Sequence, residues 1–245
     1  SNTFAGKTIK VGADIVINDG ITYIGSYAFD GLPNVQTVKI AKSVTKLGDY
    51  AFFENKKLAP HMHICLQSGA ENTLKAMRRH YTAADFRNMC DRIKTVIPDF
   101  NITTDLIVGF PGETEEDFLE SAEMCRNIGF SHIHTFKYSI RNGTKAATMP
   151  NQVPEKIKTE RSAVIRQISA ENKKRYFGQM LGKEQKMLIE RINSDGIALG
   201  YGENYIPMQL KGKNLEKNTF VNVTIDSIIN KGDNSETRVT QQDKG

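Results

Sequence analysis

Residues Asn101 to Gly112 read NITTDLIVGFPG, an apolar and β-branched run that stops at a turn of glycine and proline. Such a run, bounded by Gly and Pro, is typical of a buried strand. Residues 113–117 follow as ETEED, and acidic side chains favour the first turn of a helix, where the helix dipole is positive. Thr114 and Asp117 also have the spacing of a capping box. The stretch therefore predicts a strand, a glycine turn and a helix, with the turn placed where α/β proteins bind ligands.

Similar units lie on both sides of this stretch. Residues 61–67 predict a short strand, followed by one helix around Leu74 and a second over residues 86–96. Residues 132–138 predict another strand, after a helix that ends at Gly129. The order β-α-β-α-β implies a parallel sheet with right-handed crossovers. Since three strands cannot close a barrel, we expect an α/β fold in which this part forms half of one.

The last third of the chain predicts a basic helix and a small β-rich segment. The helix spans residues 155–177, and we expect it to expose its basic residues, Lys156, Lys158, Arg161, Arg166, Lys173, Lys174 and Arg175, and to bury Ile157, Val164, Ile165 and Ile168. Four alternating strands between residues 182 and 230 predict a small antiparallel β-barrel, followed by a polar, frayed tail.

The N-terminal segment contains an internal repeat of 23 residues, in which ITYIGSYAF at 21–29 returns as VTKLGDYAF at 44–52. The strand-like residues 14–17 return with the same shift at 37–40. This period lies within the range of about 20–29 residues that leucine-rich repeats have. The segment resembles the BspA-like leucine-rich repeats. The predicted domains are thus 1–58 (repeats), 59–150 (half-barrel), 151–182 (linker and basic helix), 183–230 (small barrel) and 231–245 (tail).

Composition narrows the class of protein. The 245 residues include 25% charged residues and carry a net charge of +5, which permits a polyanionic partner without requiring one. No apolar run reaches the roughly 20 residues of a membrane helix, and we expect no signal peptide, because residues 1–10 show no charged region followed by an apolar core. The three cysteines, Cys65, Cys90 and Cys125, are scattered, which fits reduced thiols of a cytoplasmic protein better than a disulfide framework.

Residues 58–230 resemble the radical-SAM tRNA methylthiotransferases, most closely the branch acting on N6-threonylcarbamoyladenosine. The resemblance rests on several motifs in the right order: HMHICLQSG at 61–69, MRRHYT at 77–82, TTDLIVGFPGETEEDF at 103–118, FKYSIRNGTKAA at 136–147 and GYGENY at 200–205. Members of that family combine an N-terminal cluster-binding domain, a radical-SAM barrel and a C-terminal TRAM domain that grips tRNA. The motifs present here are those of the second half of the barrel and of the TRAM domain.

The resemblance implies a partial S-adenosylmethionine site at the strand ends. Its expected cofactor-binding residues are Gln67, Ser68, Arg79, Asp105, Gly109, Glu113, Tyr138 and Ser139. Arg79 would pair with the methionyl carboxylate, for which a guanidinium fork is well suited, although an ordinary surface arginine is an alternative. The sequence departs from the family pattern twice, because Glu113 follows Gly109 by four residues rather than three and Asn142 stands where proline is frequent.

The same resemblance implies that the TRAM-like segment binds tRNA. The expected contacts are Lys183, Lys186, Lys211 and Lys213 with phosphates, and Tyr201, Asn204 and Tyr205 by stacking or hydrogen bonding. The alternative is that the tyrosines belong to the core or rim of a small barrel.

The sequence lacks the cysteine motif that the family's chemistry requires. Radical-SAM proteins hold a 4Fe–4S cluster with three thiolates spaced C-x3-C-x2-C, and no such motif occurs here. We therefore assign no catalytic residue, and we expect these residues alone neither to reduce S-adenosylmethionine nor to insert sulfur.

A second possible metal site is the alternating series His61, His63 and Cys65, which would share one face of a strand. Polar residues facing the inside of a half-barrel are the more frequent arrangement, so we expect no metal ligands here.

Two other interpretations remain open. The chain could be a leucine-rich-repeat module that binds another protein, with the downstream segment serving as scaffold. It could also be a recombined chimera whose repeats cover the exposed edge of the half-barrel sheet.

Overall fold

The computed structural model of the chain describes residues 3–4, 7–8, 13–25, 28–29, 35–40, 43, 46–47, 59–212, 214–229 and 236–241. These residues belong to two compact units, one formed by residues 1–59 and the other by residues 60–245. Among the helices that the structure describes, none combines the length and the apolar character needed to cross a membrane.

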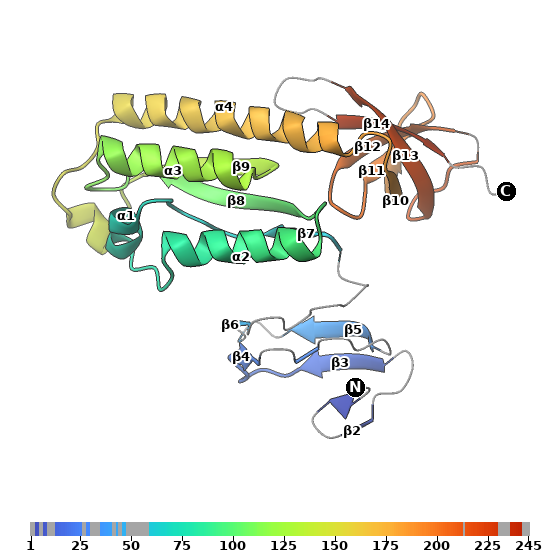
Figure 1. Ribbon diagram of the computed structural model, residues 1–245, viewed down its shortest axis with the longest axis horizontal. Helices are drawn as coiled ribbons and strands as arrows, with labels where there is room; N and C mark the ends of the chain where they lie inside the picture. The colour runs from blue at the N-terminus through green and yellow to red at the C-terminus, as the bar shows by residue number, and fades with distance from the viewer. Residues whose placement is uncertain are drawn as a thin grey trace. The chain divides into compact units, whose positions relative to one another are not determined.

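The larger unit contains a three-stranded parallel sheet in the order β7 (His61–His63), β8 (Asn101–Val108), β9 (His132–Lys137). The helices of this part are α1 (Glu71–Ala76), α2 (Ala83–Val96), α3 (Glu115–Ile128) and α4 (Glu155–Gln179), with the short 3-10 turn η1 (Lys145–Thr148) after β9. Figure 1 shows α2, α3 and α4 side by side in a layer that packs on the strands. The parallel order of these three strands inferred from the sequence is confirmed, and we keep the term half-barrel for residues 60–150.

Strand β8 is the centre of this core. Its side chains alternate between two faces, and Ile102, Leu106 and Val108 pack with the helices. Phe86 of α2, Cys125 of α3 and other apolar residues of the three long helices complete the cluster. The opposite face of β8 carries Thr103 and Asp105, so one side of the sheet is apolar and the other polar.

The helix boundaries follow the local signals in the sequence. Thr114 caps α3 and forms a capping box with Asp117, as predicted, and Gly129 ends the helix in the left-handed region with φ of 70°. Helix α2 has a second capping box, from Thr82 and Asp85. Two apolar residues expected in the core are instead exposed, Val96 by 46% and Val164 by 37%, because each lies beside the buried stripe of its helix.

The prediction that α4 exposes all of its basic side chains is wrong for two of them. Lys158 and Arg161 are 7% and 6% exposed. Three- and four-residue spacing places them on the same face as Ile165 and Ile168, which pack into the core. At the start of the helix this face meets the glycine turn after β8, where polar groups are available as partners.

Five strands between residues 184 and 241 form a closed barrel at the C-terminal end of α4 (Figure 1). Its strands are β10 (Glu184–Ile192), β11 (Ile197–Tyr201), β12 (Pro207–Lys211), β13 (Phe220–Ile229) and β14 (Glu236–Gln241), in the order β10-β11-β12-β14-β13. The prediction of a frayed tail from residue 231 is wrong for residues 236–241. These residues form β14, which pairs in parallel with β12 and antiparallel with β13 and buries Thr237 and Val239, so the barrel is not antiparallel throughout as predicted.

The smaller unit has the register of a repeat. Its strands are β1 (Thr3–Phe4), β2 (Lys7–Thr8), β3 (Ala13–Ile17), β4 (Tyr23–Ile24), β5 (Val35–Ile40) and β6 (Lys46–Leu47). Ile15 pairs in parallel with Val38 and Ile24 with Leu47, so residues one 23-residue period apart lie side by side. Strand β5 pairs with β3 and strand β7 pairs with β8. Among the described residues, the two units therefore have separate sheets.

The role of β14 can be tested with Val239→Asp and the matched surface variant Arg238→Asp. We expect Val239→Asp to lower the free energy of unfolding of the barrel by more than about 3 kcal/mol, because a carboxylate would replace an apolar group in the core. Arg238 is exposed, so Arg238→Asp should change it by less than about 1 kcal/mol. Urea unfolding followed by circular dichroism measures both, and equal effects would contradict a strand at residues 236–241.

Candidate functional site

The candidate site lies at the carboxyl ends of β7, β8 and β9 and on the polar face of their sheet. Beyond His63 the chain continues along β8, because the Ile64 amide donates to the Thr103 carbonyl and the Gln67 amide to that of Asp105, both at 2.9 Å. Between these two points the Thr104 hydroxyl replaces the ladder, accepting from the Leu66 amide and donating to the Ile64 carbonyl. The predicted strand 61–67 is therefore interrupted after residue 63, but Gln67 still lies beside β8, near the carboxyl ends of the strands.

Gln67 and Arg79 meet at this edge. Arg79 Nη2 donates to Gln67 Oε1 at 3.0 Å, so the structure brings together two residues expected to bind the cofactor. Arg79 remains exposed and can reach a ligand. Gln67 adopts φ of 65°, an uncommon value for a residue with a side chain, which is typical of functional turns.

Ser68 has a structural environment. It is 1% exposed, its hydroxyl lies 3.2 Å from that of Ser121, and it accepts from the Ala70 amide. The hydroxyl is therefore already engaged in positioning the start of α1.

The glycine turn after β8 is held by a buried ion pair. The Gly109 amide donates to Glu113 Oε1 at 2.8 Å, and Arg161 Nη1 of α4 donates to the same oxygen at 2.6 Å. Arg161 also donates to the Glu113 carbonyl at 3.2 Å and to Glu115 at 3.0 Å. Burial raises the pKa of Glu113, while the Gly109 amide and the Arg161 guanidinium act in the opposite direction.

Gly109 itself cannot be replaced without strain. Its φ is 72°, and a Cβ atom would lie 2.3 Å from Lys158 Cγ. Lys158 crosses the turn here and donates from Nζ to the Tyr138 carbonyl at 3.0 Å. The carboxylate of Glu113 is thus committed to shaping the turn, and what this turn offers a ligand is its backbone.

Tyr138 and Ser139 follow the end of β9. The Tyr138 ring packs edge-on against Phe110, with centroids 5.3 Å apart, and its hydroxyl is buried without a hydrogen-bond partner. An unsatisfied buried hydroxyl is costly, so it is a natural contact for a polar ligand atom. Ser139 is exposed. Together with Gln67, Arg79 and the Gly109 turn, these groups fit one part of an S-adenosylmethionine site.

The cysteines do not fit an iron–sulfur cluster within these 245 residues. Cys90 and Cys125 are 0% exposed, and burial raises the pKa of each thiol to about 12. They belong to the core of α2 and α3, as expected for small apolar residues. Cys65 alone of the three is exposed.

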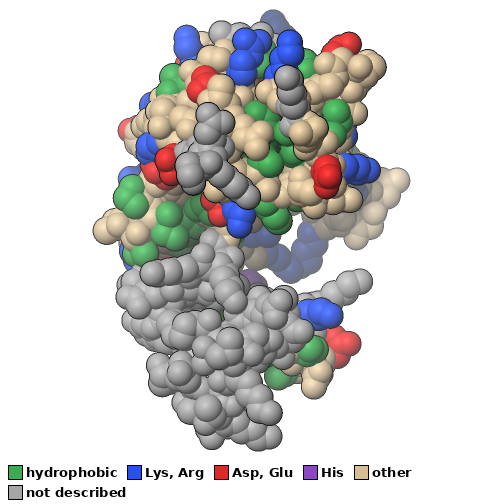
Figure 2. All heavy atoms as spheres, turned by 90° about the vertical axis from the view of Figure 1, so that its right-hand side faces the viewer, with side chains coloured by type: hydrophobic (Ala, Val, Ile, Leu, Met, Phe, Trp, Pro, Cys, Tyr) green, Lys and Arg blue, Asp and Glu red, His purple; other side chains and the backbone are tan. Residues whose placement is uncertain are grey.

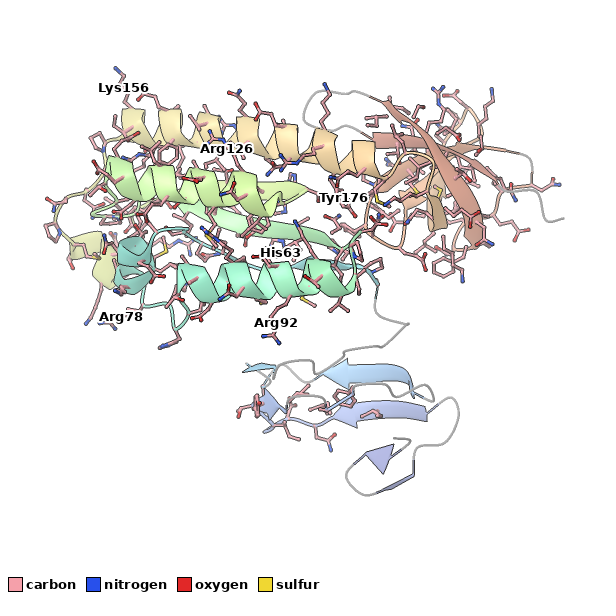
Figure 3. The ribbon with its side chains drawn as sticks, viewed as in Figure 1. His63, Arg78, Arg92, Arg126, Lys156 and Tyr176 are labelled. Carbon is pink, nitrogen blue, oxygen red and sulfur yellow. The ribbon has the colours of Figure 1, made fainter. Side chains whose placement is uncertain are left out.

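The polar face of the sheet gathers most of the histidines, a feature that the sequence pattern showed for one strand only. His61 and His63 of β7 lie beside Thr103 of β8, and His132 and His134 follow on β9. The His63 ring is 5.6 Å from that of His134, and Figure 3 shows His63 among the elements of the half-barrel. Cys65 and Asp105 complete this group, to which we refer as the histidine face.

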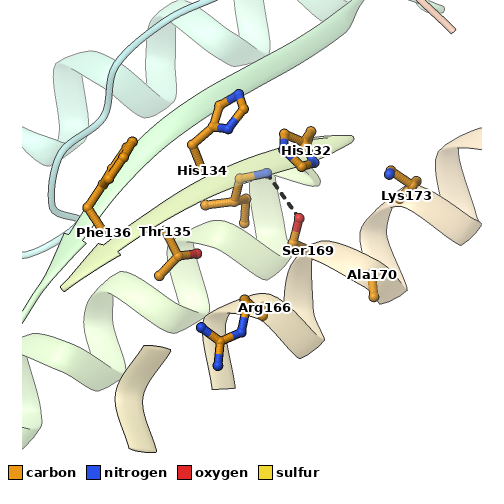
Figure 4. Close-up of a pocket in the computed structure, with 9 residues that line it drawn as sticks. His132, His134, Thr135, Phe136, Arg166, Ser169, Ala170 and Lys173 are labelled. Carbon is orange, nitrogen blue, oxygen red and sulfur yellow. Dashed lines mark hydrogen bonds between the residues drawn. The ribbon is translucent and has the colours of Figure 1, made fainter. Parts of the chain in front are cut away.

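A pocket of about 240 Å³ lies beside the histidine face, between β9 and α4 (Figure 4). Ser169 of α4 accepts from the Ile133 amide at 3.0 Å and joins the two elements. Burial and the neighbouring His134, Lys173 and His63 lower the pKa of His132 to about 4, so the imidazole is neutral at pH 7.

The predicted phosphate-binding lysines have different environments. Lys186 and Lys211 are exposed, and the Lys186 ammonium lies 5.3 Å from the centre of the Phe220 ring. Lys183 forms an ion pair with Asp99. Lys213 lies outside the described residues. Figure 2, which faces the barrel end, shows Lys and Arg side chains among hydrophobic ones.

Two of the three predicted RNA-contacting residues at the barrel edge are stacked. Tyr201 and Tyr205 lie 4.6 Å apart with planes at 11°, and Tyr205 also stacks on His61 at 4.7 Å. Asn204 does not fit the prediction. It is 1% exposed. Its side-chain amide donates to the Tyr176 hydroxyl, and its backbone carbonyl accepts from the side-chain amide of Asn101, so Asn204 joins the barrel to α4 and β8.

The comparisons with known proteins match the repeat segment and part of the α/β segment to protein families. A model of the radical SAM superfamily matches residues 38–125, and a model of the BspA type leucine rich repeat region, with six copies, matches residues 1–72. A threonylcarbamoyladenosine tRNA methylthiotransferase MtaB of Thermotoga maritima is 36% identical over 248 residues, covering 94% of this chain and 56% of that protein. The chain is thus similar to the tRNA methylthiotransferases.

Other relatives extend this similarity. The Bacillus subtilis MtaB is 34% identical over 185 residues, covering 74% of this chain and 40% of its own length. A tRNA-2-methylthio-N(6)-dimethylallyladenosine synthase of Caldicellulosiruptor saccharolyticus is 45% identical over 141 residues, 58% of this chain and 30% of that protein. The resemblance inferred from the sequence is confirmed, and the chain spans about half the length of the MtaB relative that it matches over most of its own residues.

The buried ion pair of Glu113 and Arg161 predicts that removing one partner lowers the free energy of unfolding more than removing both. Arg161→Met should lower the free energy of unfolding by about 3–5 kcal/mol, because Glu113 would remain buried without its counter-charge. Arg161→Met combined with Glu113→Gln should be less destabilising than Arg161→Met alone, since no unpaired charge is left. Arg166 is exposed on the same helix, so Arg166→Met should cost less than about 1 kcal/mol. Urea unfolding checks these values, and an additive double variant would argue against a coupled pair.

The thiol environments predict selective alkylation. Native protein should react with iodoacetamide at Cys65, and Cys90 and Cys125 should react only after unfolding. Partial burial, followed by the Asp105 carboxylate, raises the pKa of Cys65 above 9.0, so little thiolate exists at pH 8 and the rate should keep rising past pH 9. Asp105→Asn removes one of these causes and should speed labelling at pH 8. Mass spectrometry identifies the sites, and rapid native labelling of Cys90 would refute the assignment.

Proposed function

We propose that this chain provides the tRNA-binding part and a portion of the S-adenosylmethionine surface of a methylthiotransferase acting on N6-threonylcarbamoyladenosine in tRNA. The assignment to this branch is supported by the MtaB relative, whose similarity covers 94% of the chain. The five-stranded barrel would act as the TRAM domain. The observation that carries the proposal is the stack of aromatic rings at the edge of this barrel, which continues from Tyr201 and Tyr205 onto His61 of the parallel sheet; Lys186 and Lys211 are exposed on strands of the same barrel.

The conformation of Tyr205 supports a role at this edge. Its φ is 63°, a left-handed value that is unfavourable for a bulky aromatic residue, and its side chain is 56% exposed. The turn holds it there, because the Tyr205 amide donates to the Gly202 carbonyl and the Gly202 amide to that of Ile206. Strain of this kind is retained where the side chain has a function. Since Tyr205 already stacks on two rings, its hydroxyl and exposed edge are what it offers to RNA.

The strand-end groups support binding of part of S-adenosylmethionine. Arg79 would pair with the carboxylate of its methionyl group, oriented by Gln67, and the unsatisfied Tyr138 hydroxyl would face the adenosine. When bound to an iron–sulfur cluster, this cofactor supplies radical chemistry. We propose that residues 1–245 alone do not assemble that cluster, because two of their three thiols are buried in separate helices. A cytoplasmic location is part of the same proposal.

The second candidate is a protein-interaction module built on the leucine-rich repeats. It is supported by the 23-residue register and by the repeat-family match to residues 1–72. In that case the barrel would have no affinity for RNA, which separates the two candidates.

Titration of the full chain with tRNA by fluorescence anisotropy tests the proposed function. The double variant Lys186→Ala/Lys211→Ala should weaken binding and reduce the slope of log Kobs against log salt concentration by about 2, because each of the two lysines would neutralise one phosphate. Lys156 lies at the far end of α4 from the barrel (Figure 3), so Lys156→Ala should leave the slope unchanged. Tyr205→Asn relieves the backbone strain and should weaken binding without loss of stability.

Absence of salt-dependent tRNA binding by the parent chain would refute the tRNA proposal and favour the repeat module. The cluster proposal has an independent test. Anaerobic reconstitution with iron and sulfide should give no stoichiometric 4Fe–4S chromophore, and its appearance would overturn that proposal.

A further inference from the structure

Three side chains of the histidine face converge on one point. His63 Nε2 lies 3.3 Å from Asp105 Oδ1 and 3.5 Å from Cys65 Sγ, and Cys65 Sγ lies 3.4 Å from Asp105 Oδ2. The three ligand atoms all lie within 4.8 Å of one another. His63 and Cys65 are exposed and Asp105 is partly buried, so the group is open to solvent.

The two separations from His63 Nε2 match edges of a zinc tetrahedron. With Zn–N and Zn–O bonds of about 2.0–2.1 Å and a Zn–S bond of about 2.3 Å, tetrahedral angles place N and O about 3.4 Å apart and S about 3.6 Å from each. The distances of His63 Nε2 from Asp105 Oδ1, 3.3 Å, and from Cys65 Sγ, 3.5 Å, agree with these values to within about 0.2 Å, whereas the contact of 3.4 Å from Cys65 is to the other carboxylate oxygen, Oδ2. Rotation of the Asp105 carboxylate could therefore bring one oxygen, the imidazole and the thiolate onto one ion.

The geometry argues against a Cys–His–Asp catalytic triad. In such a triad the nucleophile and the acid contact opposite nitrogens of the imidazole. Here Cys65 and Asp105 both lie on the Nε2 side of His63. Nδ1 instead lies 3.0 Å from the Thr103 hydroxyl, an outer contact of the kind that orients a metal-binding histidine.

We propose that His63 Nε2, Cys65 Sγ and an oxygen of Asp105 form a site for a single Zn²⁺ or similar borderline-soft divalent ion, with the fourth position open to solvent. Imidazole and thiolate ligands select such an ion over Mg²⁺ and Ca²⁺, which take oxygen ligands. The site differs from the series His61, His63 and Cys65 considered in the sequence. The His61 ring stacks on Tyr205, and Asp105 of the neighbouring strand is the third ligand instead. The proposal does not depend on the proposed function.

Titration of the reduced full chain with Co²⁺ under anaerobic conditions tests the site. The expected result is one Co²⁺ per chain with a cobalt–thiolate charge-transfer band, displaced by Zn²⁺ and not by Mg²⁺. Because Cys90 and Cys125 are buried, that band reports on Cys65. Stoichiometric Zn²⁺ should also slow alkylation of Cys65 by iodoacetamide at least tenfold.

Variants of each ligand separate this site from adventitious binding. Cys65→Ser should abolish the thiolate band, and His63→Gln or Asp105→Asn should weaken Co²⁺ binding at least tenfold. His80→Gln and Asp195→Asn change the same residue types outside the group and should bind like the parent chain. Thermal unfolding confirms that each variant is folded. A parent chain without the band, or ligand variants that retain parental affinity, would overturn the proposal.

Discussion

The buried pair between Glu113 and Arg161 is the interaction on which the strand-end site depends. One carboxylate oxygen accepts from the Gly109 amide and from the guanidinium, so the glycine turn, the start of α3 and the first part of α4 are joined at one point. Burial of both partners makes the pair intolerant of losing either one. A helix that begins some 40 residues after the turn thereby fixes its shape, and Lys158 crosses over Gly109 where a Cβ atom would not fit.

The barrel is attached to the half-barrel through a second polar connection. Asn204 is buried, and its contacts with Asn101 and with Tyr176 connect the β11–β12 turn to β8 and to α4. The Tyr176 hydroxyl also donates to the Asp99 carbonyl at 2.8 Å. Burial raises the pKa of Tyr176, so the phenol stays protonated and able to donate. The stacked rings of His61, Tyr205 and Tyr201 lie at the same junction, so a ligand of the barrel edge would also contact the first strand of the sheet.

The position of a residue within β8 decides whether its side chain enters the apolar core or lies on the polar face of the sheet. Even-numbered residues of β8 such as Ile102 and Leu106 enter the apolar core, whereas Thr103 and Asp105 face the histidines. Cys65 lies on this polar face and is exposed, whereas Cys90 and Cys125 lie in the helices and are buried. Buried thiols remain protonated and inert, and an exposed thiol beside imidazole and carboxylate can bind a metal.

Local signals in the sequence determined the repeat period, the parallel order of the strands and the caps of α3, because each depends on residues close together in the chain. The motifs also identified the similarity to methylthiotransferases. The tertiary structure alone supplied the partners that allow Lys158 and Arg161 to be buried, closed the barrel with residues 236–241 and buried Asn204. It also placed Asp105 beside His63 and Cys65. These features join residues from 20 to 103 positions apart, and such contacts follow from strand register and helix packing rather than from local pattern.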